Sequence, residues 1–176
     1  MNQILPNGRR WRVMPRSVAV GFATGSPILT MTGVLPVQSL IAGLRLPARG
    51  GATRLTRITP HHHATAALIT IPAHCFGKGL PETDLTVGAD QVITLPGGAT
   101  SAPLNGATAD ILVRPRAMQM PAGRLAAFGF HTRPHVADHV TLWELETQRE
   151  DSVMAANLPF LSRACPESYP AGLTCH

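Results

Sequence analysis

Glycine and proline punctuate this chain from end to end, and they limit the length of any helix that it can form. The sequence holds sixteen Gly and sixteen Pro in 176 residues. Proline removes a backbone donor and clashes with the preceding helical turn, and glycine costs about 1 kcal/mol relative to alanine inside a helix. Few windows could therefore carry three helical turns. The chain is expected to fold from short strands joined by turns.

Strand-sized runs of apolar and β-branched residues recur along the sequence with turn residues between them. The first pair, residues 28–31 and 34–37, flanks the dipeptide Thr32-Gly33 and predicts a hairpin. Further strands are expected at residues 43–46, 55–58, 66–72, 84–87, 91–95, 110–113 and 140–146. The one candidate helical piece is Glu150 to Leu158, short enough to be a single turn or a loop. We predict a single all-β domain of many short strands with little helix.

The formal net charge of +5 includes four Arg close to the start of the chain, at positions 9, 10, 12 and 16. Only Trp11 could stack on a base there, and no binding module follows, so residues 1–17 are interpreted as a flexible basic segment and not as a nucleic-acid arm. The apolar run at residues 17–23 is too short for a signal peptide, and no run approaches the length of a membrane span. No cellular location is indicated.

Cysteine and histidine do not form a recognisable metal-binding pattern. Cys75, Cys165 and Cys175 include no CxxC pair, and both free thiols and a Cys165–Cys175 bridge are compatible with the sequence. In His61 to His63 an extended chain would send the outer two imidazoles to one face and His62 to the other. His131, His135 and His139 would share a helical face, but Pro134 disfavours that helix and favours a surface loop. We expect no metal site and no cofactor.

Three stretches of the sequence match one known pattern. They are GFATGSPILTMTGVLPVQSL at residues 21–40, ITIPAHCFGKGLPETDLTVGADQVITL at residues 69–95, and VTLWELETQREDSVMAANLP at residues 140–159. Together they resemble the bacterial Hint (hedgehog/intein) domain family. The resemblance implies a compact, disk-shaped all-β fold over residues 18–162, followed by a C-terminal tail at residues 163–176.

The resemblance also implies a chemistry. In active members a Cys that opens the first stretch attacks the preceding carbonyl to give a thioester. A His in the second stretch, with a Ser or Thr three residues before it, polarises the bond and protonates the leaving nitrogen. Both residue types are needed, because a thiolate is the nucleophile and an imidazole titrates near neutrality.

This sequence holds a different residue at each of those positions. The degenerate positions are Gly21 for the Cys, Gly88 for the Ser or Thr, Gln91 for the His, and Glu144 and Glu150 for two His of the closing pattern. No catalytic position is intact. Phe22 and Asp90 keep the family's residues and are expected to line the same cleft.

We therefore predict a Hint domain that is inactive for autoproteolysis and serves as a structural or interaction module. The alternative is an autoprocessing domain that uses non-standard residues, for which Ser17, Thr24 and Ser26 are nearby hydroxyls with no adjacent base expected. The smallest set expected to restore cleavage is Gly21→Cys, Gly88→Thr and Gln91→His together. The resemblance implies a larger secreted protein as partner, and the residues themselves identify none.

Overall fold

Strands make up most of the part of the chain that the structure describes. The computed structural model describes residues 18–48, 51–95 and 118–165. Its elements are β1 (Phe22–Ala23), β2 (Pro27–Thr30), β3 (Gly33–Pro36), η1 (Val37–Ser39), β4 (Arg45–Ala48), β5 (Gly51–Ile71), β6 (Leu85–Gly88), β7 (Val92–Leu95), β8 (Met118–Pro121), η2 (Ala122–Phe128), β9 (Arg133–Thr147), β10 (Ser152–Ala155), β11 (Leu158–Leu161) and β12 (Arg163–Ala164). Both helices are 3₁₀ turns. The predicted all-β class is confirmed.

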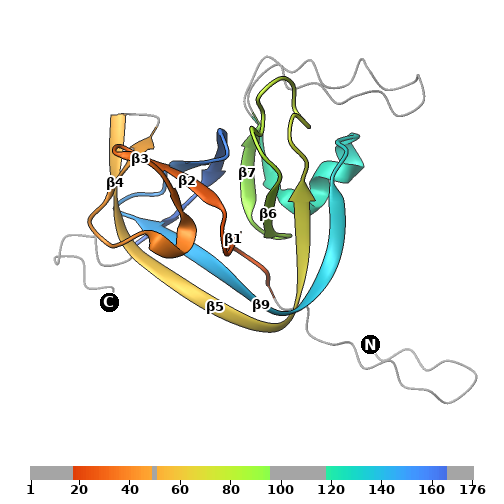
Figure 1. The fold of residues 1–176 in the computed structure, drawn as a ribbon, viewed down its shortest axis with the longest axis horizontal. Helices are drawn as coiled ribbons and strands as arrows, with labels where there is room; N and C mark the ends of the chain where they lie inside the picture. The colour runs from red at the N-terminus through yellow and green to blue at the C-terminus, as the bar shows by residue number, and fades with distance from the viewer. Residues whose placement is uncertain (1–17, 49–50, 96–117, 166–176) are drawn as a thin grey trace, which may run out of the picture.

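The strands form two six-stranded sheets, in the orders β12-β9-β1-β6-β5-β4 and β3-β2-β10-β11-β7-β8. Strands β5 and β9 also pair directly with each other as a long antiparallel ribbon, from Leu55 opposite Thr147 to Thr70 opposite Arg133. Figure 1 shows this ribbon bending beneath the rest of the molecule, with β2, β3 and β4 above one arm and β6 and β7 above the other. The short strand β1 lies between the arms.

The ribbon corrects two sequence expectations. Residues 55–58 and 66–72 were expected as separate strands, but residues 55–58 and 66–71 belong to the single strand β5, because β9 supplies a hydrogen-bonding partner along most of its length. Two of the three histidines expected on a surface loop, His135 and His139, lie in β9 instead. Pro134 is compatible with this strand because its fixed φ suits extended backbone.

The prediction of a short helix at residues 150–158 is also wrong. Residues 152–155 form β10, in which Val153 and Ala155 are buried and their neighbours are half-buried. Ala156 and Asn157 have φ values of 47° and 67°, and they form the two-residue turn of a hairpin with β11. Alternating burial and this turn favour a strand over a helix.

A single large cluster of buried side chains joins the two sheets. Phe22 of β1 and Phe160 of β11 meet edge to face with ring centroids 5.3 Å apart. Ile28, Leu85 and Ile93 are fully or almost fully buried in the same cluster. This packing fixes β1, and with it the residues just before β1, against the centre of the molecule.

Several sequence expectations fall outside the described residues: the basic segment 1–17, the strand 110–113 and the partner Cys175 of a bridge. Arg163 and Ala164, assigned from sequence to the C-terminal tail, pair with β9. No helix in the described part of the chain is long and apolar enough to cross a membrane.

Candidate functional site

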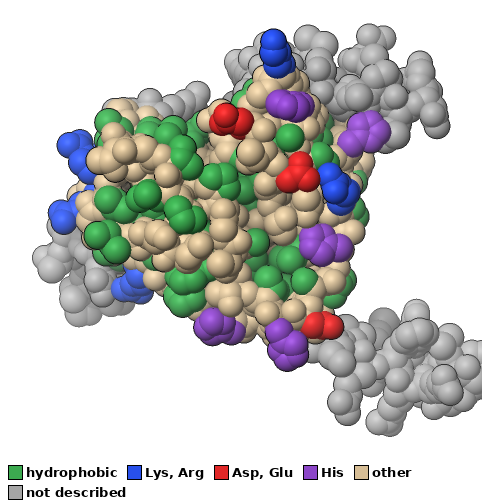
Figure 2. Space-filling view, in the orientation of Figure 1, with side chains coloured by type: hydrophobic (Ala, Val, Ile, Leu, Met, Phe, Trp, Pro, Cys, Tyr) green, Lys and Arg blue, Asp and Glu red, His purple; other side chains and the backbone are tan. Residues whose placement is uncertain are grey.

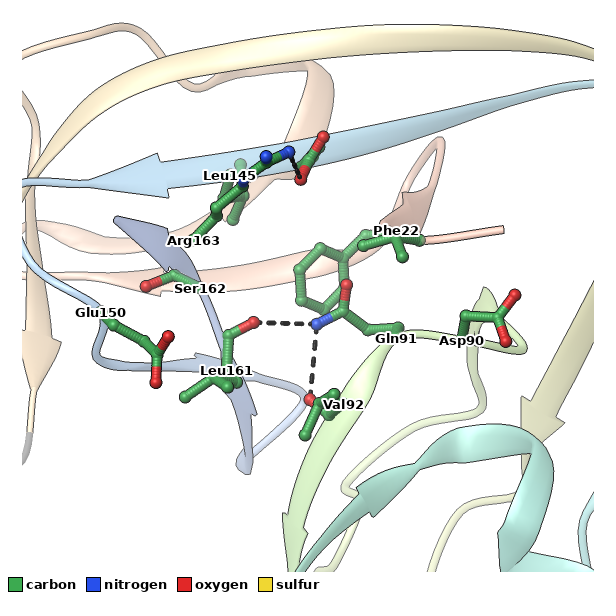
Figure 3. A pocket seen from close by; sticks show the side chains of 11 residues that line it. Phe22, Asp90, Gln91, Val92, Leu145, Glu150, Leu161, Ser162 and Arg163 are labelled. Carbon is green, nitrogen blue, oxygen red and sulfur yellow. Dashed lines mark hydrogen bonds and ion pairs between the residues drawn. The ribbon is translucent and has the colours of Figure 1, made fainter. Parts of the chain in front are cut away.

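A cleft of about 200 Å³ lies where β1, β7, β9 and the end of β11 meet (Figure 3). Its lining is Val20, Phe22, Asp90, Gln91, Val92, Glu144, Leu145, Glu150, Leu161, Ser162 and Arg163. The sequence predicted that Phe22 and Asp90 line this cleft, and both do. Apolar side chains contribute much of the wall, and four charged side chains, Asp90, Glu144, Glu150 and Arg163, also line the cleft.

The fold brings Gly21 and Gln91 into direct contact. The Gly21 amide donates a hydrogen bond of 3.0 Å to Gln91 Oε1. Gln91 Nε2 donates to the carbonyl of Leu161 at 2.9 Å and faces the carbonyl of Val92 at 3.4 Å (Figure 3). Because a backbone N–H can only donate and a carbonyl can only accept, these partners fix the orientation of the amide. The side chain is 4% exposed and ties the entry of β1 to the end of β11.

Asp90 holds the chain just before Gly21. Asp90 Oδ2 accepts the amide proton of Ala19 at 3.0 Å, and the Asp90 amide donates to the Ala19 carbonyl at 2.9 Å. The amide of Gly88 donates to the carbonyl of Gly21 at 2.9 Å. The amide and carbonyl groups of Ala19 and Gly21 are thus all bonded to the segment 88–91.

The two glycines at degenerate positions sit where backbones nearly touch. A Cβ at Gly88 would lie 2.1 Å from the carbonyl oxygen of Ala19. A Cβ at Gly21 would lie 2.8 Å from the carbonyl oxygen of Trp143, and Gly21 has a φ of +115°. Real Cβ atoms essentially never show contacts under 3.0 Å. Neither position therefore accepts a side chain without movement of the neighbouring backbone.

The carboxylates of the closing stretch occupy one side of the cleft. Glu144 Oε2 lies 2.9 Å from His61 Nε2, and its Oε1 lies 3.5 Å from Arg163 Nη1. Glu150 lines the cleft from the connection between β9 and β10. The contact with His61 was not anticipated, because only the register between β5 and β9 places residue 61 near residue 144.

The hydroxyls considered as substitute nucleophiles have structural partners. Thr24 Oγ1 accepts a hydrogen bond from Trp143 Nε1 at 2.9 Å. Ser26 is buried and its hydroxyl donates to the carbonyl of Thr86 at 3.4 Å. Ser17 lies outside the described residues. Ser162 was missed by the sequence reasoning; its hydroxyl pairs with that of Thr147 and donates to the carbonyl of Asp151 at 2.9 Å.

The thiol within the second stretch, that of Cys75, is not activated. His74 and Cys75 lie in a turn, in which His74 has a φ of 62°. Burial raises the pKa of the Cys75 thiol, which donates a hydrogen bond of 3.4 Å to the carbonyl of His131. His74 Nδ1 accepts the amide proton of Gly79 and not a proton from Cys75.

The histidine run follows the expected alternation, with His61 and His63 half-buried and His62 exposed. His62, His63 and His139 line a separate hollow. Within the described ranges, no group of three or more His, Cys, Asp or Glu side chains is arranged to hold a metal ion.

Comparison with known proteins gives a consistent result. The model of the Hint domain family matches residues 20–165. The solution structure of a bacterial intein-like domain from Clostridium thermocellum has a TM-score of 0.50 and 12% identity, and covers 82% of this chain and 99% of that chain. The crystal structure of the Ssp DnaB mini-intein variant M86 has a TM-score of 0.48 and 10% identity, covering 85% and 96%. At these identities the likeness concerns the fold alone. A search of curated protein sequences finds no match.

Proposed function

Because the chain belongs to the Hint domain family, we propose that it is a member without self-cleaving activity that serves as a structural or interaction module. The observation that carries this proposal is the close contact of the backbone at residues 19–21 with Gly88 and Trp143. Those contacts occupy the space that a nucleophile and a helping hydroxyl would need.

The hydrogen bond at the position of the cleavable peptide supports the same conclusion. Cleavage between Val20 and Gly21 requires a group that donates a proton to the Gly21 nitrogen as the bond breaks. Gln91 instead accepts a hydrogen bond from that nitrogen through Oε1. A neutral amide is also not a general acid near neutral pH, so Gln91 stabilises the intact peptide.

The remaining polar groups of the cleft do not replace this machinery. No Cys or His is among the residues that line it. Ser162 bonds to Thr147 and Asp151, and Glu144 is held by His61 and Arg163. Loss of a covalent nucleophile removes the reaction path, and loss of a general acid costs a further factor of about 10² to 10⁴.

The cleft keeps features that suit an interaction module. Its apolar and charged side chains line a small concave surface between the strands, and binding sites commonly combine a concave, mostly apolar wall with a few polar groups. The fold around the cleft is stabilised without the missing catalytic residues, because Phe22, which lines the cleft, packs edge to face against Phe160 in the core.

The test joins a reporter domain to the N-terminus of the full chain and measures intact mass after incubation with dithiothreitol or hydroxylamine. We expect one species of unchanged mass under every condition. Thiol-dependent or hydroxylamine-dependent release of the reporter would overturn the proposal. Ser162→Ala is the matched variant: if release occurs and this variant abolishes it, the domain is autoprocessing through the hydroxyl in its cleft.

A further inference from the structure

A second hollow, of about 420 Å³, lies beside strand β5 at Arg54 to Arg57 and shares no lining residue with the cleft. Its walls come from the loop before β4, from β5 and from the residues that follow β9. The lining is Ala42, Gly43, Arg54, Leu55, Thr56, Arg57, Gln148 and Cys165. Among the described residues, the lining includes two guanidinium groups and one side-chain amide and no carboxylate, and the nearby Glu146 carboxylate lies 3.7 Å from Arg57 Nε.

A β-bulge brings the two arginines to the same side of β5. Residues three apart on a regular strand point to opposite faces. The register of β5 against β9 shifts between Leu55 and Arg57, so that β5 carries one extra residue there. Both Arg54 and Arg57 consequently line the hollow. Bulges of this kind are known to re-aim side chains next to functional sites.

Two arginines face each other on strands β4 and β5 beside the hollow. Arg54 lies directly opposite Arg45 in the β4–β5 pairing, and like charges in such pairs destabilise a sheet. Arg54 forms no ion pair with any side chain in the described ranges, although Arg57 Nε lies 3.7 Å from Glu146 Oε2. Figure 2 shows positively charged side chains along the edge where β3 and β4 lie in Figure 1, with no Asp or Glu among them on this face.

The hollow has a preformed floor. The amide of Gly43 donates to the carbonyl of Leu55 at 2.7 Å, and the amide of Gln148 donates to the carbonyl of Arg54 at 3.0 Å. A Cβ at Gly43 would lie 3.5 Å from Arg54 Nη2. The glycine therefore leaves the space beside that guanidinium open. Thr56 donates to the carbonyl of Glu146 at 2.9 Å and fixes the bulge.

We propose that this hollow binds a phosphate group, either inorganic phosphate or a phosphomonoester. Arginine guanidiniums match phosphate oxygens with two parallel hydrogen bonds. The donors come from separate segments of the chain, and a tetrahedral phosphate presents three oxygens that reach in different directions, whereas the two oxygens of a carboxylate are coplanar. The site is independent of whether the cleft cleaves.

The test titrates the full chain, labelled with ¹⁵N, with inorganic phosphate, O-phospho-L-serine and acetate, and follows the amide and arginine Nε signals by NMR. We expect saturable shifts centred on Gly43, Thr56 and Gln148 with both phosphates, and much weaker shifts with acetate. Tighter binding of phosphoserine would identify a phosphorylated side chain as the physiological source, and equal binding would identify a small phosphate. Either result supports the site.

Variants separate a built site from general positive charge. Arg54→Gln should weaken phosphate binding about tenfold or more, because a hydrogen bond to a charged group contributes about 1.5–3 kcal/mol. Arg124→Gln removes the same charge from an exposed position outside the hollow, and it should change the affinity by less than about twofold. Equal weakening by the two variants, absence of saturation, or acetate binding as tight as phosphate would each overturn the proposal.

Discussion

Restoring the residues that active relatives carry should destabilise this protein before it restores any cleavage. The sequence alone led us to expect that Gly21→Cys, Gly88→Thr and Gln91→His together would repair the site. The structure argues against this because the added Cβ at residue 88 would lie 2.1 Å from the carbonyl oxygen of Ala19. Backbone at that point must retreat by about 1 Å before the contact becomes an ordinary one.

The cost can be estimated from the bonds that such a retreat disturbs. Ala19 is fully buried and bonds to Asp90 through both its amide and its carbonyl. Overpacking of a tight core costs about 1–3 kcal/mol, and each hydrogen bond that is lost costs about 1 kcal/mol more. Gly88→Ala should therefore lower the free energy of unfolding by about 3–5 kcal/mol, a large share of the 5–15 kcal/mol typical of a domain.

Urea unfolding followed by tryptophan fluorescence measures this loss. With a slope of about 2 kcal/mol per molar, the midpoint for Gly88→Ala should fall by about 1.5–2.5 M. Two glycines serve as controls. Gly25→Ala meets nothing within 4 Å and adds only the strain of a φ of +91°, about 1 kcal/mol. Gly123→Ala comes within 3.1 Å of the Ala89 carbonyl and should fall between the other two.

Two outcomes would refute the reasoning. A Gly88→Ala protein with a free energy of unfolding within about 0.5 kcal/mol of the original would show that the backbone yields easily. A triple variant that folds, as judged by circular dichroism, and releases an N-terminal reporter with dithiothreitol would show that the scaffold still accepts the catalytic side chains.

Three further predictions concern single side chains. Gln91→Leu leaves the Gly21 amide and the Leu161 carbonyl without partners and should lower the free energy of unfolding in urea by about 2–4 kcal/mol. Gln38→Leu removes an exposed hydrogen bond to Gly25 and should lower it by under about 1 kcal/mol. Similar losses in the two variants would contradict the central role of Gln91. Glu144→Gln should cost at most about 1 kcal/mol, and less at high salt, because its partners His61 and Arg163 are largely solvated; a loss above about 3 kcal/mol would contradict this. Cys75 should be alkylated by iodoacetamide more slowly than a free thiol at pH 8, because a raised pKa lowers the thiolate fraction, and its rate should go on rising to a higher pH than the rate of a free thiol does. Peptide mass spectrometry measures the rate of alkylation. A rate equal to that of free cysteine would contradict the burial.

The parts of the fold that follow from local pattern were predictable from the sequence. The hairpin at residues 28–37 was found, although the turn is one residue earlier than expected, since Thr30 pairs with Gly33. The displacement has a local cause that a pattern of apolar residues does not encode. Thr30 Oγ1 donates to the carbonyl of Gly33 at 2.6 Å and accepts the amide proton of Thr32 at 3.2 Å, which closes the turn.

The parts that depend on pairing between distant segments were not predictable. The sequence indicated strands near residues 55, 66 and 140 but not that β5 runs unbroken to residue 71 against β9. That register decides that His61 contacts Glu144, and its bulge decides that Arg54 and Arg57 share one hollow. Such relations require the closure of long loops, which no short window of sequence describes.

Gly88 shows why the meaning of a substitution depends on the backbone around it. In the sequence it stands for a missing hydroxyl, but in the structure it is the residue that lets the chain at Ala19 approach. The same approach places the Gly21 amide against Gln91 and the Asp90 carboxylate against the Ala19 amide. The three degenerate positions 21, 88 and 91 are therefore physically coupled. Side chains at positions 21 and 88 would push the backbone of residues 19–21 away from the segment 88–91. A His at position 91 would lose the hydrogen bonds that hold these two segments together. We therefore expect the effects of the three substitutions on stability to be non-additive.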